Sequence, residues 1–384
     1  TGGVSNEGRV ITLEYPEFYL VNAYVPNVRR DLERIPLRME WEDALREHLA
    51  VLNAKKPDPI FNGARVTCAY KWGSRDLACA LTRYEKFIGQ MKRSGVKMVD
   101  SIPELLAECD CVLLETNDGR EHLWQAEKVF KSGKPVFIDK PIAHNYFDAL
   151  QILREARARK AKFFSCSALR WTEKVQAARN GKVGEVRGVT YAAPSPLERT
   201  HSRFAWYGIH GFEPLVTVLG TGAESVGCVS TENEDLVTVK WRDGRLASLR
   251  LMRGAGMWNY SGQAFTTEKG VADLGGYEGY APMLEEILKF FKTGVVPYPP
   301  EETEEIFCLM AAAELSGKQG GRIVKLDEIR EKAASAQRAP GDVRARDLTP
   351  LKSFTAGKGP SAIVAKGRFP QMTIVAEESR EGRF

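Results

Sequence analysis

The feature that most constrains the fold is a regular alternation of short apolar runs and amphipathic segments between residues 64 and 165. Short apolar runs are typical of strands, and apolar residues spaced three or four positions apart are typical of helices. Ser101 and Glu104 form a capping box, which predicts a helix start. Strands that alternate with helices predict a parallel sheet covered on both faces. The expected strands are 64–70, 111–116, 135–139 and 162–167, and the expected helices are 75–94, 101–108, 121–132 and 145–160.

After about residue 185 the alternation stops, and the expected strands follow one another directly. Asp243 and Gly244 stand between two of them, and this dipeptide favours a tight hairpin turn. Consecutive strands joined by short turns predict an antiparallel sheet, so this part is of the α+β type. The expected strands are 185–193, 224–231, 235–241, 245–254 and 261–267; helices are expected at 205–219, 281–292 and 301–316, the last packing back on the first domain.

The two ends of the chain differ from this middle part. Residues 8–27 are typical of two strands and residues 37–52 of an amphipathic helix. From about residue 332 the chain is polar, basic and rich in Gly, Pro and Ser, which is typical of a poorly packed tail. We therefore expect four parts: an N-terminal piece (1–62), an α/β nucleotide-binding-type domain (63–165), an antiparallel sheet domain (166–330) and a tail (331–384).

Composition excludes several classes of protein. The 55 Lys and Arg exceed the 50 Asp and Glu by too little to indicate a nucleic-acid partner. No apolar run approaches the roughly 18 residues that span a bilayer, so we expect a soluble chain. Seven cysteines without a C-x-x-C pair predict reduced thiols, a cytoplasmic location and no metal site. The start lacks a Met and a signal peptide, so we expect a fragment.

The strongest local signal for chemistry is Asp139-Lys140-Pro141, directly after the apolar run 135–138. In an open parallel sheet, ligands bind at the carboxyl ends of the strands. A lysine at that place is a candidate for contact with a ligand. The alternative is a solvated lysine at the end of a strand.

Several motifs in order carry a family resemblance: DSIPELL, the long run VLLETNDGREHLWQAEKVFKSGKPVFIDKPIA, SALRW and WYGIHGFEPLVTVLG. With them, residues 63–329 resemble the Gfo/Idh/MocA oxidoreductases, such as glucose-fructose oxidoreductase and inositol dehydrogenase. The resemblance implies a nicotinamide-binding Rossmann domain joined to an open antiparallel sheet domain. It also implies hydride transfer between NAD or NADP and a hydroxyl-bearing, sugar-like small molecule.

The resemblance also assigns roles to residues, each of which has a plainer alternative. Lys140 matches the catalytic lysine, His210 the acid/base histidine, and Glu213 a position that orients the imidazole or binds substrate. The alternative for His210 is a structural histidine on an apolar helix, and for Arg170 it is a helix-start arginine that caps carbonyls or pairs with an acid. The implied cofactor-binding residues are Thr116, Asn117, His122, Asp139, Pro141 and Lys71, and the implied substrate-binding residues are Arg170 and Tyr207.

Three departures from the family pattern weaken the prediction of activity. Trp206 stands where the family has an acid four residues before the histidine. Lys71 stands near the place of the acid that binds the ribose 2′-hydroxyl of NAD, and a lysine suits a 2′-phosphate better. The first strand and its G-x-G-x-x-G turn are missing before Ala64, so we expect impaired cofactor binding. A degenerate binding protein without catalysis is therefore the alternative.

Residues 8–56 resemble an internal segment of the exonuclease III type apurinic/apyrimidinic endonucleases. Tyr24 and Asn27 match residues near the nuclease site. The metal-binding Glu, the Gly-Asp-Leu-Asn strand and the later Asp and His of that site have no counterparts, so an inert remnant is the favoured interpretation. A DNA-repair nuclease is the third functional hypothesis, and a homo-oligomer formed through the antiparallel sheet is a further expectation.

Overall fold

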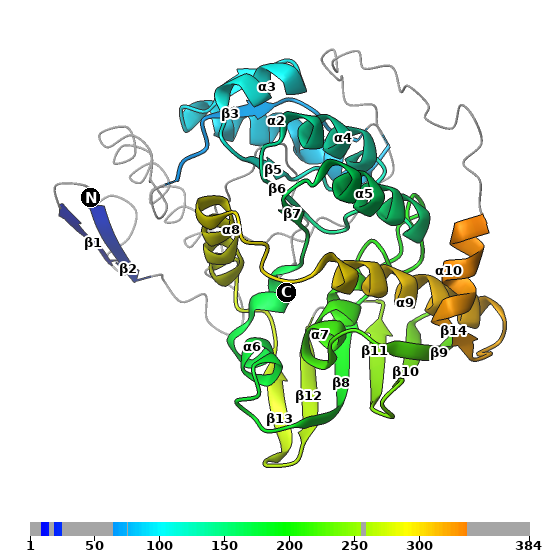
Figure 1. Cartoon of the computed structure of the whole chain (residues 1–384). Coiled ribbons are helices and arrows are strands. Elements are labelled where there is room, and N and C mark those ends of the chain that lie inside the picture. The colour runs from blue at the N-terminus through cyan, green and yellow to red at the C-terminus, as the bar shows by residue number, and fades with distance from the viewer. Residues whose placement is uncertain (1–8, 15–18, 25–63, 75, 255–258, 336–384) are drawn as a thin grey trace. The chain divides into compact units, whose positions relative to one another are not determined.

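The computed structural model describes residues 9–14, 19–24, 64–74, 76–254 and 259–335, in two compact units (Figure 1). The first unit comprises residues 1–65 and 89–97. Its described strands are β1 (Arg9–Glu14) and β2 (Tyr19–Tyr24), which pair antiparallel with Arg9 opposite Tyr24. The two expected strands are confirmed. The helix expected at 37–52, and Asn27, lie outside the described residues.

The alternation of strands and helices expected after residue 64 is confirmed. Ser101 caps α3 by accepting a hydrogen bond from the Glu104 amide at 3.3 Å, and Asn145 caps α5 by accepting one from Asp148 at 2.9 Å. A short strand, β4, has no counterpart in the sequence prediction. The elements are β3 (Cys68–Tyr70), α2 (Ala78–Arg93), β4 (Lys97–Val99), α3 (Ile102–Glu108), β5 (Val112–Leu114), α4 (His122–Ser132), β6 (Val136–Ile138), α5 (Tyr146–Arg159) and β7 (Phe163–Phe164).

The strands of this part fall into two separate sheets. β5, β6 and β7 pair in parallel, with Val112 opposite Val136 and Val136 opposite Phe163. β3 pairs with β4, and within the described part of the chain no ladder joins β3 to β5. In the doubly wound strand order 3-2-1-4-5-6, the first strand lies between the second and the fourth. The break therefore falls at the place where the missing first strand is expected.

The second part of the larger unit is built on a seven-stranded sheet of order β13-β12-β8-β11-β10-β9-β14. The strand pairings of this sheet are antiparallel, as expected, except that β8 and β11 pair in parallel, with Leu246 opposite Gly188, so the sheet is mixed. The chain crosses over through α7 between β8 and β9, which returns β11 in the direction of β8. The elements are η1 (Ala168–Trp171), α6 (Glu173–Arg179), β8 (Val186–Pro194), α7 (Ile209–Leu219), β9 (Ala223–Ser230), β10 (Glu234–Trp241), β11 (Leu246–Met252), β12 (Ser261–Thr266), β13 (Gly270–Gly275), α8 (Ala281–Thr293), α9 (Pro300–Lys318), β14 (Val324–Lys325) and α10 (Leu326–Ser335).

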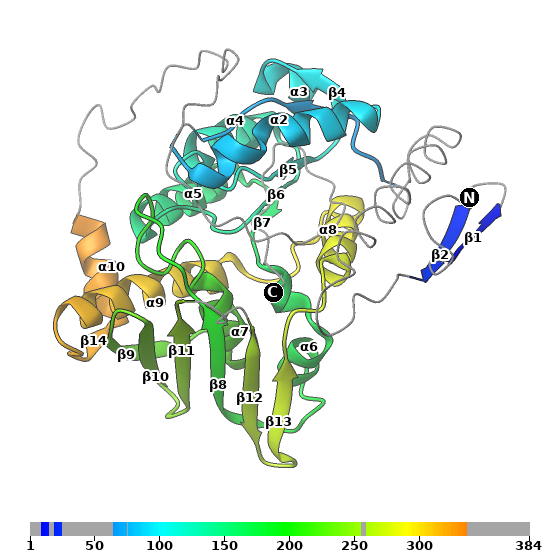
Figure 2. The same ribbon diagram turned by 180° about the vertical axis from the view of Figure 1, so that it is seen from behind.

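One face of this sheet is covered by helices and holds the core (Figure 1). Every residue of α7 is buried, and α9 packs on α7 and β9. Strand β10 shows the alternation that results, with Val237 and Val239 buried and Thr238 and Lys240 exposed. Seen from behind, the strands lie in front of these helices (Figure 2).

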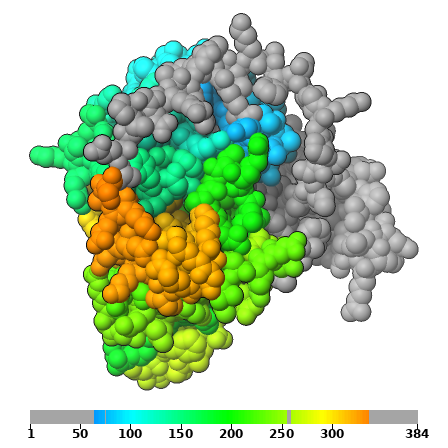
Figure 3. Space-filling model, turned by 90° about the vertical axis from the view of Figure 1, so that its right-hand side faces the viewer, coloured from blue at the N-terminus to red at the C-terminus, as the bar shows by residue number. Residues whose placement is uncertain are grey.

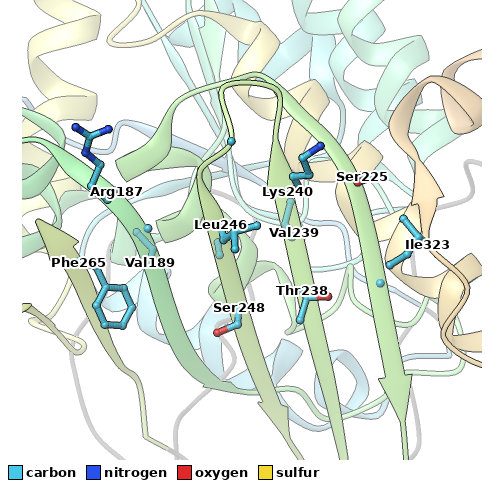
Figure 4. Close-up of a pocket in the computed structure, with 14 residues that line it drawn as sticks. Arg187, Val189, Ser225, Thr238, Val239, Lys240, Leu246, Ser248, Phe265 and Ile323 are labelled. Carbon is cyan, nitrogen blue, oxygen red and sulfur yellow. The ribbon is translucent and has the colours of Figure 1, made fainter.

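The outer face of the sheet carries a hollow of about 550 Å³ (Figure 4). Apolar and polar side chains from several strands line it, including Leu246 from β11, Phe265 from β12 and Lys240 from β10. Leu246 is 62% exposed and Phe265 42% exposed. Neither Lys140 nor His210 lines this hollow.

Helix α9 packs back on the first domain, as expected, because Tyr146 of α5 donates a hydrogen bond to Glu304 of α9. Helix α10 lies against α9 and β14 (Figure 3). The boundary of the expected tail is therefore wrong, since residues 331–335 complete α10. Leu326, Ile329 and Ala333 are buried at helical spacing, a pattern too short to stand out among the surrounding charges. Residues 336–384 lie outside the described residues.

Candidate active site

Lys140 follows β6, where the parallel strands reach their carboxyl edge. The Asp139 amide donates to the carbonyl of Leu114 at 2.9 Å, so the ladder between β5 and β6 continues to the residue before the lysine. The Lys140–Pro141 peptide bond is cis. The Nζ atom of Lys140 lies 5.0 Å from the centroid of the Tyr207 ring, close enough for a cation–π contact. The lysine therefore meets a residue of the sheet domain.

His210 lies in the first turn of α7 and comes to the same place. Its ring is 4.9 Å from the Tyr207 ring and 5.7 Å from the Tyr260 ring, in edge-on arrangements. Its Nδ1 atom is 2.7 Å from the hydroxyl of Ser167. Burial, and secondarily the charge of Lys140, lower the pKa of His210 well below its ordinary value, so the imidazole is neutral at pH 7.

The pKa of the Asp139 carboxyl group, next to the lysine in sequence, is shifted upward, whereas that of His210 is shifted downward. Burial raises the pKa of Asp139 to about 6, although the charge of Lys140 opposes the rise. A lysine, a neutral imidazole and two tyrosine rings thus converge near the end of β6. A lysine and an imidazole within reach of one oxygen atom can exchange its proton and stabilise its negative charge.

Glu213 and Arg170 are brought together with each other, away from solvent. Arg170 is 1% exposed, and its Nε donates to Glu213 at 2.7 Å and its Nη1 to Glu302 at 2.6 Å. The second oxygen of Glu213 accepts the Ser167 amide at 2.7 Å. Burial raises the pKa of Glu213, opposed by Arg170. The expected roles of Glu213 in catalysis and of Arg170 in substrate binding stay predictions, and this geometry favours a structural ion pair.

The expected cofactor-binding residues after β5 are buried and hydrogen-bonded within the protein. The Thr116 hydroxyl donates to Gln125 at 3.0 Å, and the Asn117 amide donates to the sulfur of Cys79 at 3.1 Å. His122 is fully buried, with Nδ1 at 3.1 Å from the carbonyl of Ile142 and Nε2 against that of Thr116. These hydrogen bonds hold the loop in place, and the roles of Thr116, Asn117 and His122 in cofactor binding stay predictions.

Lys71 lies directly after β3, which belongs to the separate sheet of β3 and β4. Its Nζ atom forms a 3.0 Å ion pair with Asp100, and both side chains are partly exposed. A cation such as Lys71 suits the 2′-phosphate of NADP, but here the carboxylate of Asp100 partly neutralises its charge. The role of Lys71 in cofactor binding stays a prediction.

Sequence reasoning missed a second polar cluster formed by Asp118 and His201. The Nε2 atom of His201 accepts the Gly119 amide at 3.2 Å, and its Nδ1 lies 2.8 Å from the Thr200 hydroxyl. Asp118 is fully buried and binds the Arg120 guanidinium. No motif spacing links residues 118 and 201, so only the fold brings them together. Trp206, at the position of the family acid, packs against His201 with ring centroids 5.0 Å apart.

In ranges 64–74, 76–254 and 259–335, no group of three or more His, Cys, Asp or Glu side chains is arranged to hold a metal ion. Within these same ranges, every helix is too short or too polar to cross a bilayer.

The described fold, in which Lys140 and His210 approach each other near the end of β6, is similar to that of solved structures that include a putative myo-inositol dehydrogenase. Residues 45–166 match the model of the oxidoreductase family with an NAD-binding Rossmann fold, which is the Gfo/Idh/MocA family. The expected resemblance is therefore confirmed over this stretch. The match begins in a segment that lies outside the described residues.

Solved structures agree on the fold. A putative myo-inositol dehydrogenase from Sinorhizobium meliloti 1021 is 19% identical, covers 68% of this chain and 92% of its own, and has a TM-score of 0.57. The NAD complex of GenD2 from gentamicin A biosynthesis is 18% identical, with coverages of 63% and 86% and a TM-score of 0.55. The WlbA dehydrogenase from Bordetella pertussis, in complex with NADH and UDP-GlcNAcA, is 18% identical, with coverages of 63% and 87% and a TM-score of 0.51.

The N-terminal segment matches a different class of protein. An exodeoxyribonuclease from Bacillus subtilis (strain 168) is 53% identical over 51 residues, 13% of this chain and 20% of that protein. The DNA repair nuclease APEX1 from Danio rerio is also 53% identical over 51 residues, 16% of its length. The chain thus spans about a fifth or less of these curated relatives, and the expected chimeric N-terminus is confirmed.

Proposed function

We propose that this chain is an NAD(P)-dependent oxidoreductase that acts on a hydroxyl-bearing, sugar-like small molecule. The observation that carries the proposal is the convergence of Lys140 and neutral His210 beside Tyr207 at the end of β6. The family match and the dehydrogenase neighbours support it. Neighbours named as an inositol dehydrogenase and as a UDP-GlcNAcA complex support the substrate class.

The chemistry proposed for the residues concerns one oxygen atom of the substrate. A bound nicotinamide would accept or supply the hydride at the adjacent carbon. Lys140 would hold or accept the proton of the hydroxyl, and His210 would hydrogen-bond the same oxygen. Tyr207, in contact with both side chains, would form one wall around the substrate.

The described residues fit the nicotinamide end of the cofactor better than its pyrophosphate. The sheet breaks where the first strand and its glycine turn would lie, and neither is found among the described residues. Without backbone donors at a helix N-terminus, pyrophosphate binding loses several hydrogen bonds. We therefore propose impaired cofactor binding. This same break favours a second candidate, a binding protein of the same fold that does not catalyse.

Two further proposals concern the cellular compartment of the protein and the activity of its N-terminal segment. The seven cysteines all lie among the described residues and form no disulfide there, which supports a reducing compartment such as the cytoplasm. The nuclease hypothesis rests on the 51-residue match alone, and we propose that this segment confers no incision of DNA. Metal-dependent cleavage of abasic-site DNA that disappears in a Tyr24→Phe variant would contradict this.

A cofactor titration followed by tryptophan fluorescence tests the main proposal. We expect dissociation constants above about 100 μM for NAD and NADP, because a loss of several kcal/mol in backbone contacts weakens binding more than a hundredfold. A micromolar constant for either cofactor would contradict the impairment.

Activity measurements test the roles of the two residues. Where turnover of a polyol or sugar is measurable, Lys140→Ala should lower kcat/KM by roughly a hundredfold or more, and His210→Ala by less. Lys182→Ala, at an exposed lysine, is the matched control and should leave the rate unchanged. Near-normal turnover of Lys140→Ala would show that the lysine is only a solvated strand end.

A further inference from the structure

Ser167 lies between β7 and η1 and is the hydrogen-bond partner of the candidate histidine. Its side chain is buried, and its Oγ atom is 2.7 Å from Nδ1 of His210. The same oxygen accepts the amide of Leu169 at 3.2 Å. The sequence resemblance gives this serine no role.

The hydrogen-bond inventory of the hydroxyl decides which way the bond to His210 runs. A serine hydroxyl has one hydrogen to donate and two lone pairs to accept with. The Leu169 amide occupies one lone pair. Within the described part of the chain, Nδ1 of His210 is the only acceptor within reach of the hydrogen. If Nδ1 carried a hydrogen and donated it, the serine hydrogen would be buried without an acceptor, which is unfavourable.

We propose that Ser167 is a positioning residue that holds neutral His210 in the tautomer with its hydrogen on Nε2. The hydroxyl donates to the bare Nδ1, and the ring is held with Nε2–H as a donor. In the proposed function, on which this consequence rests, Nε2–H donates to the substrate oxygen. In the direction of carbonyl reduction, the charged ammonium of Lys140 would then give its proton to that oxygen, because Nε2–H of His210 hydrogen-bonds the oxygen and keeps its own hydrogen.

The surroundings of Ser167 explain how a hydroxyl can fix the ring so firmly. Its amide donates to Glu213 at 2.7 Å, and its carbonyl accepts the amide of Arg170 at 3.2 Å. Arg170 in turn holds Glu213 by its Nε at 2.7 Å. Glu213, one turn after His210 on α7, therefore acts on the imidazole through the serine backbone. This gives the acid a positioning role that does not require contact with substrate.

Nitrogen NMR of protein labelled with ¹⁵N-histidine tests the assignment without cofactor or substrate. The chain has five histidines, and the spectrum of a His210→Gln variant identifies the His210 signals by their loss. In the wild-type protein at about pH 7.5, where the imidazole is neutral, we expect Nδ1 without hydrogen and Nε2 with hydrogen, in at least roughly tenfold excess. A hydrogen on Nδ1 in the wild-type protein would overturn the proposal.

Variants of the serine separate positioning from general stability. Ser167→Ala should reduce the excess of the Nε2–H tautomer to less than about threefold, and Ser167→Thr, which keeps the hydroxyl, should restore it. Ser195→Ala is the control, since this buried hydroxyl has no hydrogen-bond partner in the described chain, and it should leave the His210 signals unchanged. Unchanged His210 signals in Ser167→Ala would also overturn the proposal. If Ser167→Ala does not fold, the wild-type spectrum alone decides.

The outcome is independent of whether the enzyme is active. A wild-type tautomer as expected, in a protein that turns over no polyol or sugar, would contradict the proposed function and leave the role of Ser167 intact. An active enzyme with the hydrogen on Nδ1 would contradict the role of Ser167 and leave the proposed function intact.

Discussion

At the scale of single residues, burial determines the protonation states near the candidate site. His201 accepts the Gly119 amide at Nε2, so Nε2 carries no hydrogen and the ring is neutral. Burial lowers the pKa of His201 to about 3, although the nearby charge of Asp118 opposes the change. Protonation would break the hydrogen bond that joins the loop after β5 to the segment before α7.

We predict that His201 makes the fold sensitive to acid. Its folded pKa is below its unfolded value of about 6.5, so between roughly pH 6.5 and 3 only the unfolded chain binds this proton. Stability should therefore fall as the pH falls through that window, by up to about 2 kcal/mol between pH 7 and pH 5. Urea unfolding of the wild-type protein and of His201→Gln at both pH values measures this. The variant should lose less stability than the wild type, and equal losses would rule the histidine out as the cause.

At the scale of elements, the Arg170 network joins four helices. Arg170 of η1 binds Glu213 of α7 and Glu302 of α9, and Arg179 of α6 binds both oxygens of Glu302. The Arg170 guanidinium also lies 3.8 Å from the Tyr298 ring. The two arginines balance the two carboxylates, so the network is stable only when complete.

We predict that Arg170→Met destabilises the protein by about 3–5 kcal/mol, because it leaves the buried carboxylate of Glu213 without a cation. Arg157→Met is the matched control. Arg157 forms an ion pair with Glu301, and their side chains are 82% and 57% exposed. Exposed ion pairs contribute less than about 1 kcal/mol to stability. The free energy of unfolding in urea measures both. Equal effects of the two substitutions would contradict the structural role of the network.

A second feature at the scale of elements is the break in the sheet: among the described residues, no strand pairing joins β3 to β5. We predict that placing a strand with a G-x-G-x-x-G turn before Ala64 raises the affinity for NAD or NADP at least roughly tenfold, since it restores backbone donors for the pyrophosphate. The same insert with its glycines replaced by alanine is the control, because a Cβ prevents the close approach of the backbone. The fluorescence titration measures both proteins. A gain that persists in the alanine insert would mean that the glycine turn is not the cause.

At the scale of the whole molecule, the outer face of the seven-stranded sheet exposes several large apolar side chains. Leu246 of β11, Phe265 of β12 and Val271 of β13 are 62%, 42% and 52% exposed on this face. Exposed apolar patches of this kind mark contact surfaces. The expected homo-oligomer through this sheet remains a prediction.

We predict that the chain self-associates through this face and that the double variant Leu246→Lys with Phe265→Lys weakens the association at least roughly tenfold, because charges would be buried without partners. Val295→Lys is the control, since Val295 is 67% exposed but lies outside the sheet. Sedimentation velocity over a range of concentrations measures the association. A double variant that associates as the wild type does would exclude this face.

The sequence by itself determined most of the local structure, because helix caps and hydrophobic periodicity act over a few residues. Ser101, Asn145 and Gly133 mark helix ends where the structure has them, with Gly133 in the left-handed conformation at φ 74°. The order of strands and helices after residue 64, and the place of Lys140 after β6, follow from the same signals. The motifs around Lys140 lie within residues 45–166, which match the family model, whereas the motifs around His210 lie beyond that match.

Only the tertiary structure decided which residues far apart in the sequence pair with each other. The crossover through α7 makes β8 and β11 parallel, a non-local pairing that strand periodicity does not encode. The pairing of Arg170 with Glu213 and Glu302, and of Ser167 with His210, joins residues 43 to 132 positions apart. Such contacts depend on how the helices pack. A buried charge or polar group without a partner is unfavourable, and the partner can come from any part of the chain that packs beside it. For that reason the sequence could name Lys140 and His210, but not the serine that holds the histidine.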